Sequence, residues 1–280
     1  MKPAPFEYHA PETVDEAVEL LAQGNGTQVL AGGQSLVQLL KFRSAKPSAL
    51  VDVNGVAGLE VLEEREGELH VGATVRQQRL LTDPLVEHWP LLREAARYIG
   101  YLETRRRGTV CGSLAFAASW AELTAAAVAL DAAIDVRSTR GDRTIAARDF
   151  FVGSRRTALE DDELITKARF PRPAARTGAG FHEISDRHRD YAQLAAAALV
   201  TVDDAGTPTA AELVLLRVAD APLRIDATAA VDDADALYEL LADIDPQSDV
   251  EVSAAHRRRV APVLARRALR DAAERARGAA

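Results

Sequence analysis

The spacing of hydrophobic residues changes several times along the first half of the chain. Thr13 and Glu16 form a capping box in front of apolar residues at helical spacing, which predicts a helix that ends at Gly24. Short apolar runs bounded by turn residues predict strands instead. Strands are expected at residues 27–31, 50–53, 58–62, 69–73, 132–137, 143–146 and 163–170, and further helices at residues 75–81, 91–99 and about 120–130. Residues 63–68 are expected to form the charged turn of a hairpin. The pattern therefore indicates short α/β units rather than one long parallel sheet.

The second half of the chain has a different pattern. Residues 171–178 are rich in Pro, Gly and charge, and they mark the expected domain boundary. Beyond them, Pro262 is expected either in a first helical turn or at a kink. Three strands are expected at residues 180–184, 192–202 and 210–218, and helices at residues 233–241 and about 253–277. A small antiparallel sheet packed on helices follows from this order, so the whole chain is expected to have an α+β fold.

Composition and charge narrow the classes of function. The chain has 280 residues and a net charge of -8, and an acidic protein is poorly suited to the phosphate backbone of nucleic acids. The arginine clusters at residues 105–107 and 257–259 are expected to be solvated, with contact to a polyanion or a partner as the alternative. Cys111 is the single cysteine, so the chain forms no internal disulfide and lacks the ligands for an iron–sulfur cluster of its own.

Targeting and metal-binding signals are not found in the sequence. Residues 1–7 contain no apolar core of a signal peptide, and the longest apolar run, residues 123–130, is too short to cross a bilayer. We therefore expect no membrane insertion and a cytoplasmic location. The six histidines are scattered without metal-ligand spacing, so no metal site is expected.

One stretch carries the strongest signal for a ligand. Val29 and Leu30 end a strand, and Gly32 and Gly33 then make a sharp turn before a short apolar run that Ser35 can cap. Such a turn can aim several main-chain N–H groups at one point, which suits a phosphate or pyrophosphate. The spacing is not that of a G-x-G-x-x-G motif, a nucleotide-triphosphate loop or a hydrolase nucleophile elbow. A turn that binds nothing is the alternative. The candidate residues are Leu30, Ala31, Gly32, Gly33, Gln34, Ser35 and Leu36.

A second glycine-bearing stretch lies further along the chain. Gly108 and Gly112 allow close approach of the backbone to a ligand, while Thr109 and Ser113 offer hydroxyl groups. The alternative is an ordinary loop. Two such loops in one domain suit an extended ligand with a phosphate bridge and several polar groups, such as a dinucleotide.

Two isolated side chains are further candidates. Tyr191, which follows Asp190 at the start of an expected strand, can stack on a planar ring or can pack in the core. Glu122 can accept a hydrogen bond from a sugar hydroxyl or can be a solvated helix residue. No Ser/His/Asp arrangement or paired carboxylates stand out, so no catalytic residue is predicted.

Three motifs together resemble one known family. They are A-G-G-Q-S-L at residues 31–36, G-T-V-C-G-S at residues 108–113 and D-Y-A at residues 190–192. Their order and spacing resemble the FAD-binding medium subunit of molybdenum hydroxylases, the family of the carbon monoxide dehydrogenase flavoprotein and the FAD domain of xanthine dehydrogenase. The resemblance covers nearly the whole chain. It implies an FAD-binding domain at residues 1–173, made of two small α/β subdomains at about 1–56 and 57–173, and a C-terminal flavoprotein domain at residues 178–280.

The resemblance also implies roles for the candidate residues. Residues 31–36 would hold the FAD pyrophosphate through main-chain N–H groups, and residues 108–113 would form the second FAD loop. Glu122 would lie near the sugar or phosphate of the cofactor. Tyr191 would lie against the isoalloxazine ring, and Asp190 would help to set its loop.

Two features depart from the family's usual pattern. Cys111 stands where the second loop usually has the first of two glycines. Ala118 and Ser119, followed by the bulky Trp120, stand where the family often has an acidic-proline pair. Both features fall where the cofactor is expected to pass, and a reduced affinity for FAD is one implied outcome.

In this family a large subunit carries a molybdenum–pterin cofactor, a small subunit carries two [2Fe–2S] clusters, and FAD passes electrons to an external acceptor. The resemblance implies that this chain is the medium subunit, with those two partners, in a dimer of heterotrimers. The single cysteine agrees with this division of labour. One alternative is a stand-alone FAD-dependent oxidoreductase acting directly on substrate, for which Cys111 is the sole candidate for flavin attachment. The other is a partner subunit that has lost FAD.

Overall fold

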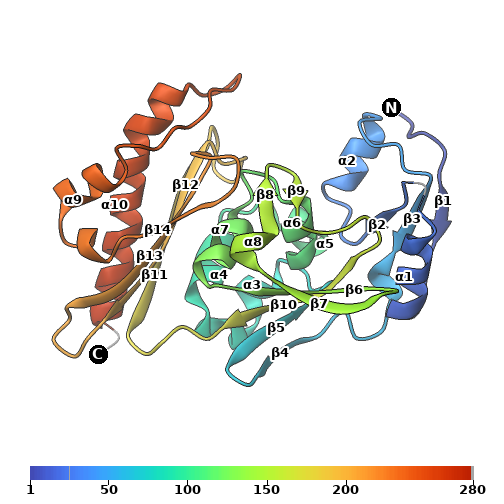
Figure 1. Cartoon of the computed structure of the whole chain (residues 1–280), viewed down its shortest axis with the longest axis horizontal. Coiled ribbons are helices and arrows are strands. Elements are labelled where there is room, and N and C mark those ends of the chain that lie inside the picture. The colour runs from blue at the N-terminus through green and yellow to red at the C-terminus, as the bar shows by residue number, and fades with distance from the viewer. Residues whose placement is uncertain (25, 279–280) are drawn as a thin grey trace.

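The computed structural model describes residues 1–24 and 26–278. Three sheets follow one another along the long axis of the molecule (Figure 1). A three-stranded sheet lies at one end, a five-stranded sheet with helices lies in the middle, and a four-stranded sheet covered by the long C-terminal helix lies at the other end. The α+β fold expected from the sequence is confirmed.

The first sheet is parallel, with the strand order β1-β3-β2. Its strands are β1 (Glu7–His9), β2 (Gln28–Leu30) and β3 (Ala49–Asp52), followed by a short 3-10 helix η1 (Val53–Gly55). Between β1 and β2 lies α1 (Val14–Ala22), in which both hydrogen bonds of the Thr13–Glu16 capping box are present. The short helix α2 (Leu36–Lys41) follows the glycine turn. Ser35 makes no side-chain capping bond to it, so that expectation is wrong.

The middle sheet is antiparallel, with the strand order β4-β5-β10-β6-β7. Its strands are β4 (Leu62–Arg65), β5 (Glu68–Gly72), β6 (Ala133–Ser138), β7 (Gly141–Ala146) and β10 (Leu164–Pro171). The remaining elements of this part are α3 (Arg79–Thr82), η2 (Pro84–His88), α4 (Pro90–Ala96), α5 (Leu102–Arg107), α6 (Val110–Phe116), α7 (Glu122–Ala129), α8 (Ala147–Phe150), β8 (Phe151–Gly153) and β9 (Arg156–Thr157).

Two expectations for the middle part are wrong. The strand expected at residues 58–62 is displaced to β4, because Glu66 and Gly67 both have positive φ and make a two-residue hairpin turn. The helix expected at residues 75–81 is reduced to α3. Its first half instead donates backbone N–H bonds to another segment, from Gln77 to Gly108 O at 2.9 Å and from Gln78 to Arg105 O at 3.0 Å.

The C-terminal part is a four-stranded antiparallel sheet in sequence order. Its elements are β11 (Thr177–Ile184), β12 (Leu194–Val202), β13 (Pro208–Leu216), β14 (Leu223–Asp226), η3 (Thr228–Ala230), α9 (Ala234–Leu240) and α10 (Ala254–Gly278). Pro262 lies in the interior of α10 and not in its first turn. Successive residues of β12 alternate between two cores: Ala195 and Ala197 face the middle part, while Ala196 and Ala198 pack with α10. Strand β12 is therefore buried on both faces.

The expectation that both arginine clusters are solvated is wrong for one residue of each cluster. Arg105 is buried, and its guanidinium donates to the carbonyl groups of Ile99 and Gly100 at 2.7 and 2.6 Å. Arg257 on α10 is also buried. In both cases one arginine of the cluster satisfies buried polar groups while its neighbours stay at the surface.

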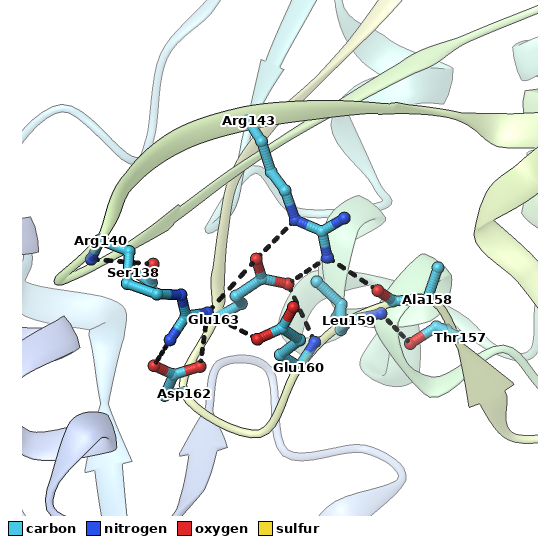
Figure 2. Close-up of polar contacts among 9 residues, drawn as sticks. All are labelled: Ser138, Arg140, Arg143, Thr157, Ala158, Leu159, Glu160, Asp162 and Glu163. Carbon is cyan, nitrogen blue, oxygen red and sulfur yellow. Dashed lines mark hydrogen bonds and ion pairs between the residues drawn. The ribbon is translucent and has the colours of Figure 1, made fainter.

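A cluster of ion pairs anchors the loop between β9 and β10 to the hairpin of β6 and β7 (Figure 2). Arg143 donates to both carboxylate oxygens of Glu163, at 2.6 and 2.7 Å, and Glu163 also accepts the N–H of Glu160 at 2.9 Å. Arg140 pairs with Asp162 and with Glu160 in the same cluster. The side chain of Glu163 is only 3% exposed, so its charge depends on these partners.

The variant Glu163→Gln is expected to lose about 2 kcal/mol of unfolding free energy at pH 7, because a two-point charged hydrogen bond is replaced by a neutral one. The hydrogen bond from Arg143 lowers the pKa of Glu163. The ion pair therefore stabilises the folded protein fully at pH values above the ordinary pKa of glutamate. This stabilisation is lost as the pH falls through the lowered pKa of Glu163 in the folded protein. Urea unfolding at pH 7 measures the effect, with Asp161→Asn in the same loop as the control. Equal stability of the two variants would contradict the prediction.

Candidate functional site

The turn at residues 31–35 presents free backbone donors. Within the described part of the chain, none of the N–H groups of residues 32–35 donates to a backbone or side-chain acceptor. The carbonyl groups of Gly33 and Ser35, in contrast, accept the N–H groups of Val37 and Leu39. Gly33 has a φ of +72°, which turns the chain toward α2. An array of donors without internal acceptors is the geometry that an anion such as pyrophosphate requires.

Gly32 brings the two glycine-bearing stretches into contact. A Cβ atom at this position would lie 2.3 Å from the carbonyl oxygen of Arg107 and 2.7 Å from the Cα of Gly108. Both neighbours are backbone atoms that cannot rotate away. The first turn therefore packs directly on the entry to the second stretch, as one ligand bound by both would require.

A chain of polar side chains holds this junction together. Arg76 donates to the Arg107 carbonyl and to Oδ1 of Asn54, at 2.6 Å in each case. Asn54 in turn donates to the carbonyl of Ala31 at 2.8 Å and to Asp52 at 2.6 Å. Local sequence predicts only a strand that contains Asp52 and a helix that contains Arg76, and it gives no role at the site to these residues or to Asn54. Their pairing across the fold left no signal in local spacing.

The second stretch is a helix start rather than an ordinary loop. Thr109 is the N-cap of α6, and its hydroxyl accepts the N–H of Gly112 at 3.0 Å. Ser113 lies one turn into this helix and is partly exposed. The hydroxyl of Thr109 therefore already caps the N-terminus of α6. The main chain just before it, at Arg107 and Gly108, packs on the glycine turn at Gly32.

Cys111 does not project into the path of a ligand. Its side chain is buried, and its thiol donates to the carbonyl of Val71 on β5 at 3.4 Å. Burial raises the pKa of the thiol to about 12. A buried, protonated thiol is a poor nucleophile, so this residue is unsuited to covalent attachment of a flavin.

Glu122 is buried, contrary to the alternative of a solvated helix residue. It begins α7 and is only 8% exposed. Burial raises the pKa of its carboxyl group to about 7. Glu183 on β11 lies close enough to interact with it: burial, followed by the charge of Glu122, raises the pKa of Glu183 to about 9. The charge of Glu122 therefore disfavours ionisation of Glu183 where α7 packs on the C-terminal sheet. Local sequence gives no sign of this interaction because the two residues are far apart in the chain.

The variant Glu122→Gln is expected to be more stable than the wild type at pH 8, by up to about 3 kcal/mol, and nearly equal to it at pH 4.5. The folded-state pKa is raised, so the folded protein holds a proton that the unfolded chain releases as pH rises above about 4.5. Stability of the wild type therefore falls with rising pH until both states are ionised. Thermal melts from pH 4.5 to 8 measure this, with Glu19→Gln on the exposed face of α1 as the control. A parallel pH profile for wild type and variant would refute the prediction.

Tyr191 is exposed, so the alternative of a core aromatic is wrong. Tyr191 is 68% exposed, and the centroid of its ring lies 5.1 Å from that of the Trp120 ring. Asp190 accepts the N–H of Tyr191 through its side chain at 2.9 Å. An exposed ring on a locally braced loop can stack on a planar ligand.

The candidate residues thus fall into two groups. In the first group, residues 31–36 and residues 108–113 meet at Gly32. In the second group, Tyr191 of the C-terminal part contacts Trp120, which lies two residues before Glu122 in the chain. A turn with free N–H groups and an exposed aromatic ring would fit the pyrophosphate and the ring system of a flavin dinucleotide. Among the described residues no group of His, Cys, Asp and Glu side chains could hold a metal ion. Within the same residues, no helix combines the length and the apolar character needed to cross a membrane.

Comparisons with known proteins agree with this geometry. Residues 4–173 match the family described as FAD binding domain in molybdopterin dehydrogenase, and residues 179–272 match the CO dehydrogenase flavoprotein C-terminal domain. The chain is 36% identical to the 6-hydroxypseudooxynicotine dehydrogenase complex subunit alpha of Paenarthrobacter nicotinovorans, over 99% of this chain and 97% of that protein. It is 33% identical to the carbon monoxide dehydrogenase medium chain of Afipia carboxidovorans, over 99% of each chain.

Solved structures show the same fold over the full length. Quinoline 2-oxidoreductase from Pseudomonas putida 86 superposes with a TM-score of 0.92 at 33% identity, covering 99% of this chain and 100% of that chain. Carbon monoxide dehydrogenase from Hydrogenophaga pseudoflava superposes with a TM-score of 0.91 at 32% identity, covering 98% and 99%. The resemblance stated from the three motifs is therefore confirmed: the chain belongs to the family of FAD-binding medium subunits of molybdenum hydroxylases.

Proposed function

We propose that this chain is the electron-transfer subunit of a heterotrimeric molybdenum hydroxylase. In this proposal, electrons reach its FAD from [2Fe–2S] clusters on a small subunit and leave to an external acceptor. A large subunit with the molybdenum–pterin cofactor hydroxylates the substrate, and two heterotrimers associate. The observation that carries the proposal is the array of free N–H groups at residues 32–35. The single cysteine supports placing the clusters on another chain.

The residues proposed to hold FAD are those that the sequence analysis selected. The turn from Leu30 to Leu36 would bind the pyrophosphate through its N–H groups, with Gly108, Thr109, Gly112 and Ser113 lining the adjacent backbone. Glu122 would face a sugar hydroxyl, and in its protonated form it donates as well as accepts. Asp190 would brace Tyr191, whose exposed ring would cover the isoalloxazine. A bound flavin supplies the conversion between one-electron and two-electron transfer, while the chain supplies binding, orientation and shielding from water.

The proposal is tested by purifying the tagged chain with whatever subunits accompany it. We expect two further polypeptides, iron and molybdenum in the complex, and one FAD per copy of this chain, released on denaturation. The mass of the intact complex tests the dimer of heterotrimers. A flavin that stays bound to denatured protein would favour the stand-alone oxidoreductase, and a colourless protein without partners would refute the proposal.

A further inference from the structure

Trp120 is contacted by three residues distant in the sequence, namely Tyr191, Arg155 and Arg217. The ring centroid of Tyr191 lies 5.1 Å from its own, with the two planes inclined by 46°. The guanidinium carbons of Arg155 and Arg217 lie 5.2 and 5.8 Å from the indole centroid. These distances are within the range of cation–π attraction, so the indole is held by both arginines.

The two arginines are themselves held in place. Arg217, which follows β13, donates to the hydroxyl of Ser119 at 3.2 Å and pairs with Asp249. Arg155 donates its N–H to the carbonyl of Ala117 at 2.7 Å, which ties the turn between β8 and β9 to the segment that carries Trp120. The indole therefore has partners in both the middle and the C-terminal parts of the fold.

A buried arginine links this arrangement back to the loop of Tyr191. Arg257 on α10, only 3% exposed, pairs with Asp249. The same guanidinium donates to the carbonyl of Gln193 at 3.2 Å, two residues after Tyr191. Contacts thus lead from Trp120 through Arg217, Asp249 and Arg257 to the carbonyl of Gln193. The loop that carries Gln193 also carries Tyr191, whose aromatic ring contacts Trp120 and closes the circuit.

Left-handed backbone occurs at three positions in the segments around Trp120. Ala117, Arg155 and Arg217 are non-glycine residues with φ values of 47°, 56° and 68°. This left-handed conformation is unfavourable for side chains with a Cβ and persists where the surrounding structure demands it. Two of these residues, Arg155 and Arg217, contact the indole of Trp120, which indicates that its position is imposed by the fold.

We propose that Trp120 is a positioning residue for Tyr191, which it holds in the orientation needed to cover the flavin ring. The inference rests on the proposed function, because it takes Tyr191 as the residue that meets the flavin. Among the described residues, Trp120 is the one aromatic ring in contact with Tyr191, whose own exposure leaves it little other packing. A ring held in advance loses less rotational freedom when the flavin binds, so affinity is gained without a new contact to the ligand.

The test is a double-mutant cycle on the full chain, alone or with the subunits that purify with it. The variants are Trp120→Leu, Tyr191→Leu and the double variant, with Trp120→Phe as the conservative replacement. Tyr238→Leu, an exposed tyrosine on α9, is the matched control. After removal of flavin, titration with FAD gives the dissociation constant, the absorption spectrum of bound flavin reports ring stacking, and a thermal melt reports folding.

We expect Trp120→Leu to weaken FAD binding about fivefold, as the loss of one aromatic pair predicts. It should also shift the flavin spectrum in the same direction as Tyr191→Leu, and Trp120→Phe should restore most of both effects. The double variant should bind no more weakly than Tyr191→Leu alone, because the two residues then act as one unit. Tyr238→Leu should change neither quantity.

Three results would overturn the inference while leaving the proposed function intact. The first is a multiplicative loss in the double variant, which would mean that the residues act independently. The second is wild-type affinity and spectrum in Trp120→Leu. The third is loss of affinity with a lowered melting midpoint but no spectral shift, since that indicates a structural role alone. Failure of the wild-type protein to bind FAD would instead refute the proposed function.

Discussion

The variant Gly32→Ala is expected to fold but to bind FAD at least a hundredfold more weakly than the wild type, a loss of about 3 kcal/mol. The added Cβ would meet the Arg107 carbonyl oxygen at 2.3 Å and the Cα of Gly108 at 2.7 Å. Because neither is a side chain that can rotate, the first turn and the second stretch must separate. Their separation would move the free N–H groups of residues 32–35 away from the second stretch.

The measurement is an FAD titration of the flavin-free protein, with circular dichroism to confirm that the variant is folded. Gly55→Ala is the matched control, because the nearest atom to its Cβ is the Pro11 carbonyl oxygen at 3.9 Å, an ordinary contact. Gly33→Val, at a φ of +72°, should behave like Gly32→Ala. Wild-type affinity in both glycine variants would show that the pyrophosphate does not bind at this turn.

Much of the fold was predictable because it is encoded by residues close together in the chain. The capping box of Thr13 and Glu16 forms as its spacing predicts. The apolar run at residues 192–202 predicts a strand, and this strand is β12. The first glycine turn was found in the same way, since a strand, two glycines and an apolar run are adjacent in the sequence.

Features that depend on distant partners were not predictable from spacing. Arg76 reaches Asn54 and the Arg107 carbonyl only after three separate segments have packed together. Glu122 looked like a surface residue, yet α7 lies between the middle part and the C-terminal sheet and has no exposed face. The position of β4 was misjudged because its charged residues resemble a turn, whereas they occupy an exposed edge strand beside β5.

The C-terminal part depends on a close approach between α10 and β11, which only a residue without a side chain permits. A Cβ at Gly180 would lie 2.1 Å from the carbonyl oxygen of Ala268 in α10. The facing residues Ala268, Ala265 and Ala272 are fully buried alanines, so the helix already lies as near the sheet as small side chains allow. Any larger residue at this point of the sheet must push the helix outward.

The variant Gly180→Val is therefore expected to lose about 3 kcal/mol of unfolding free energy. This loss corresponds to a melting midpoint that is lower by about 6 °C or more. Because α10 carries Arg257, outward movement of the helix should also release the carbonyl of Gln193 and weaken FAD binding. Gly278→Ala at the end of the same helix, with no atom within 4 Å of its Cβ, is the control and should melt like the wild type. A Gly180→Val variant with the wild-type midpoint would mean that the helix and the sheet are not in close contact in solution.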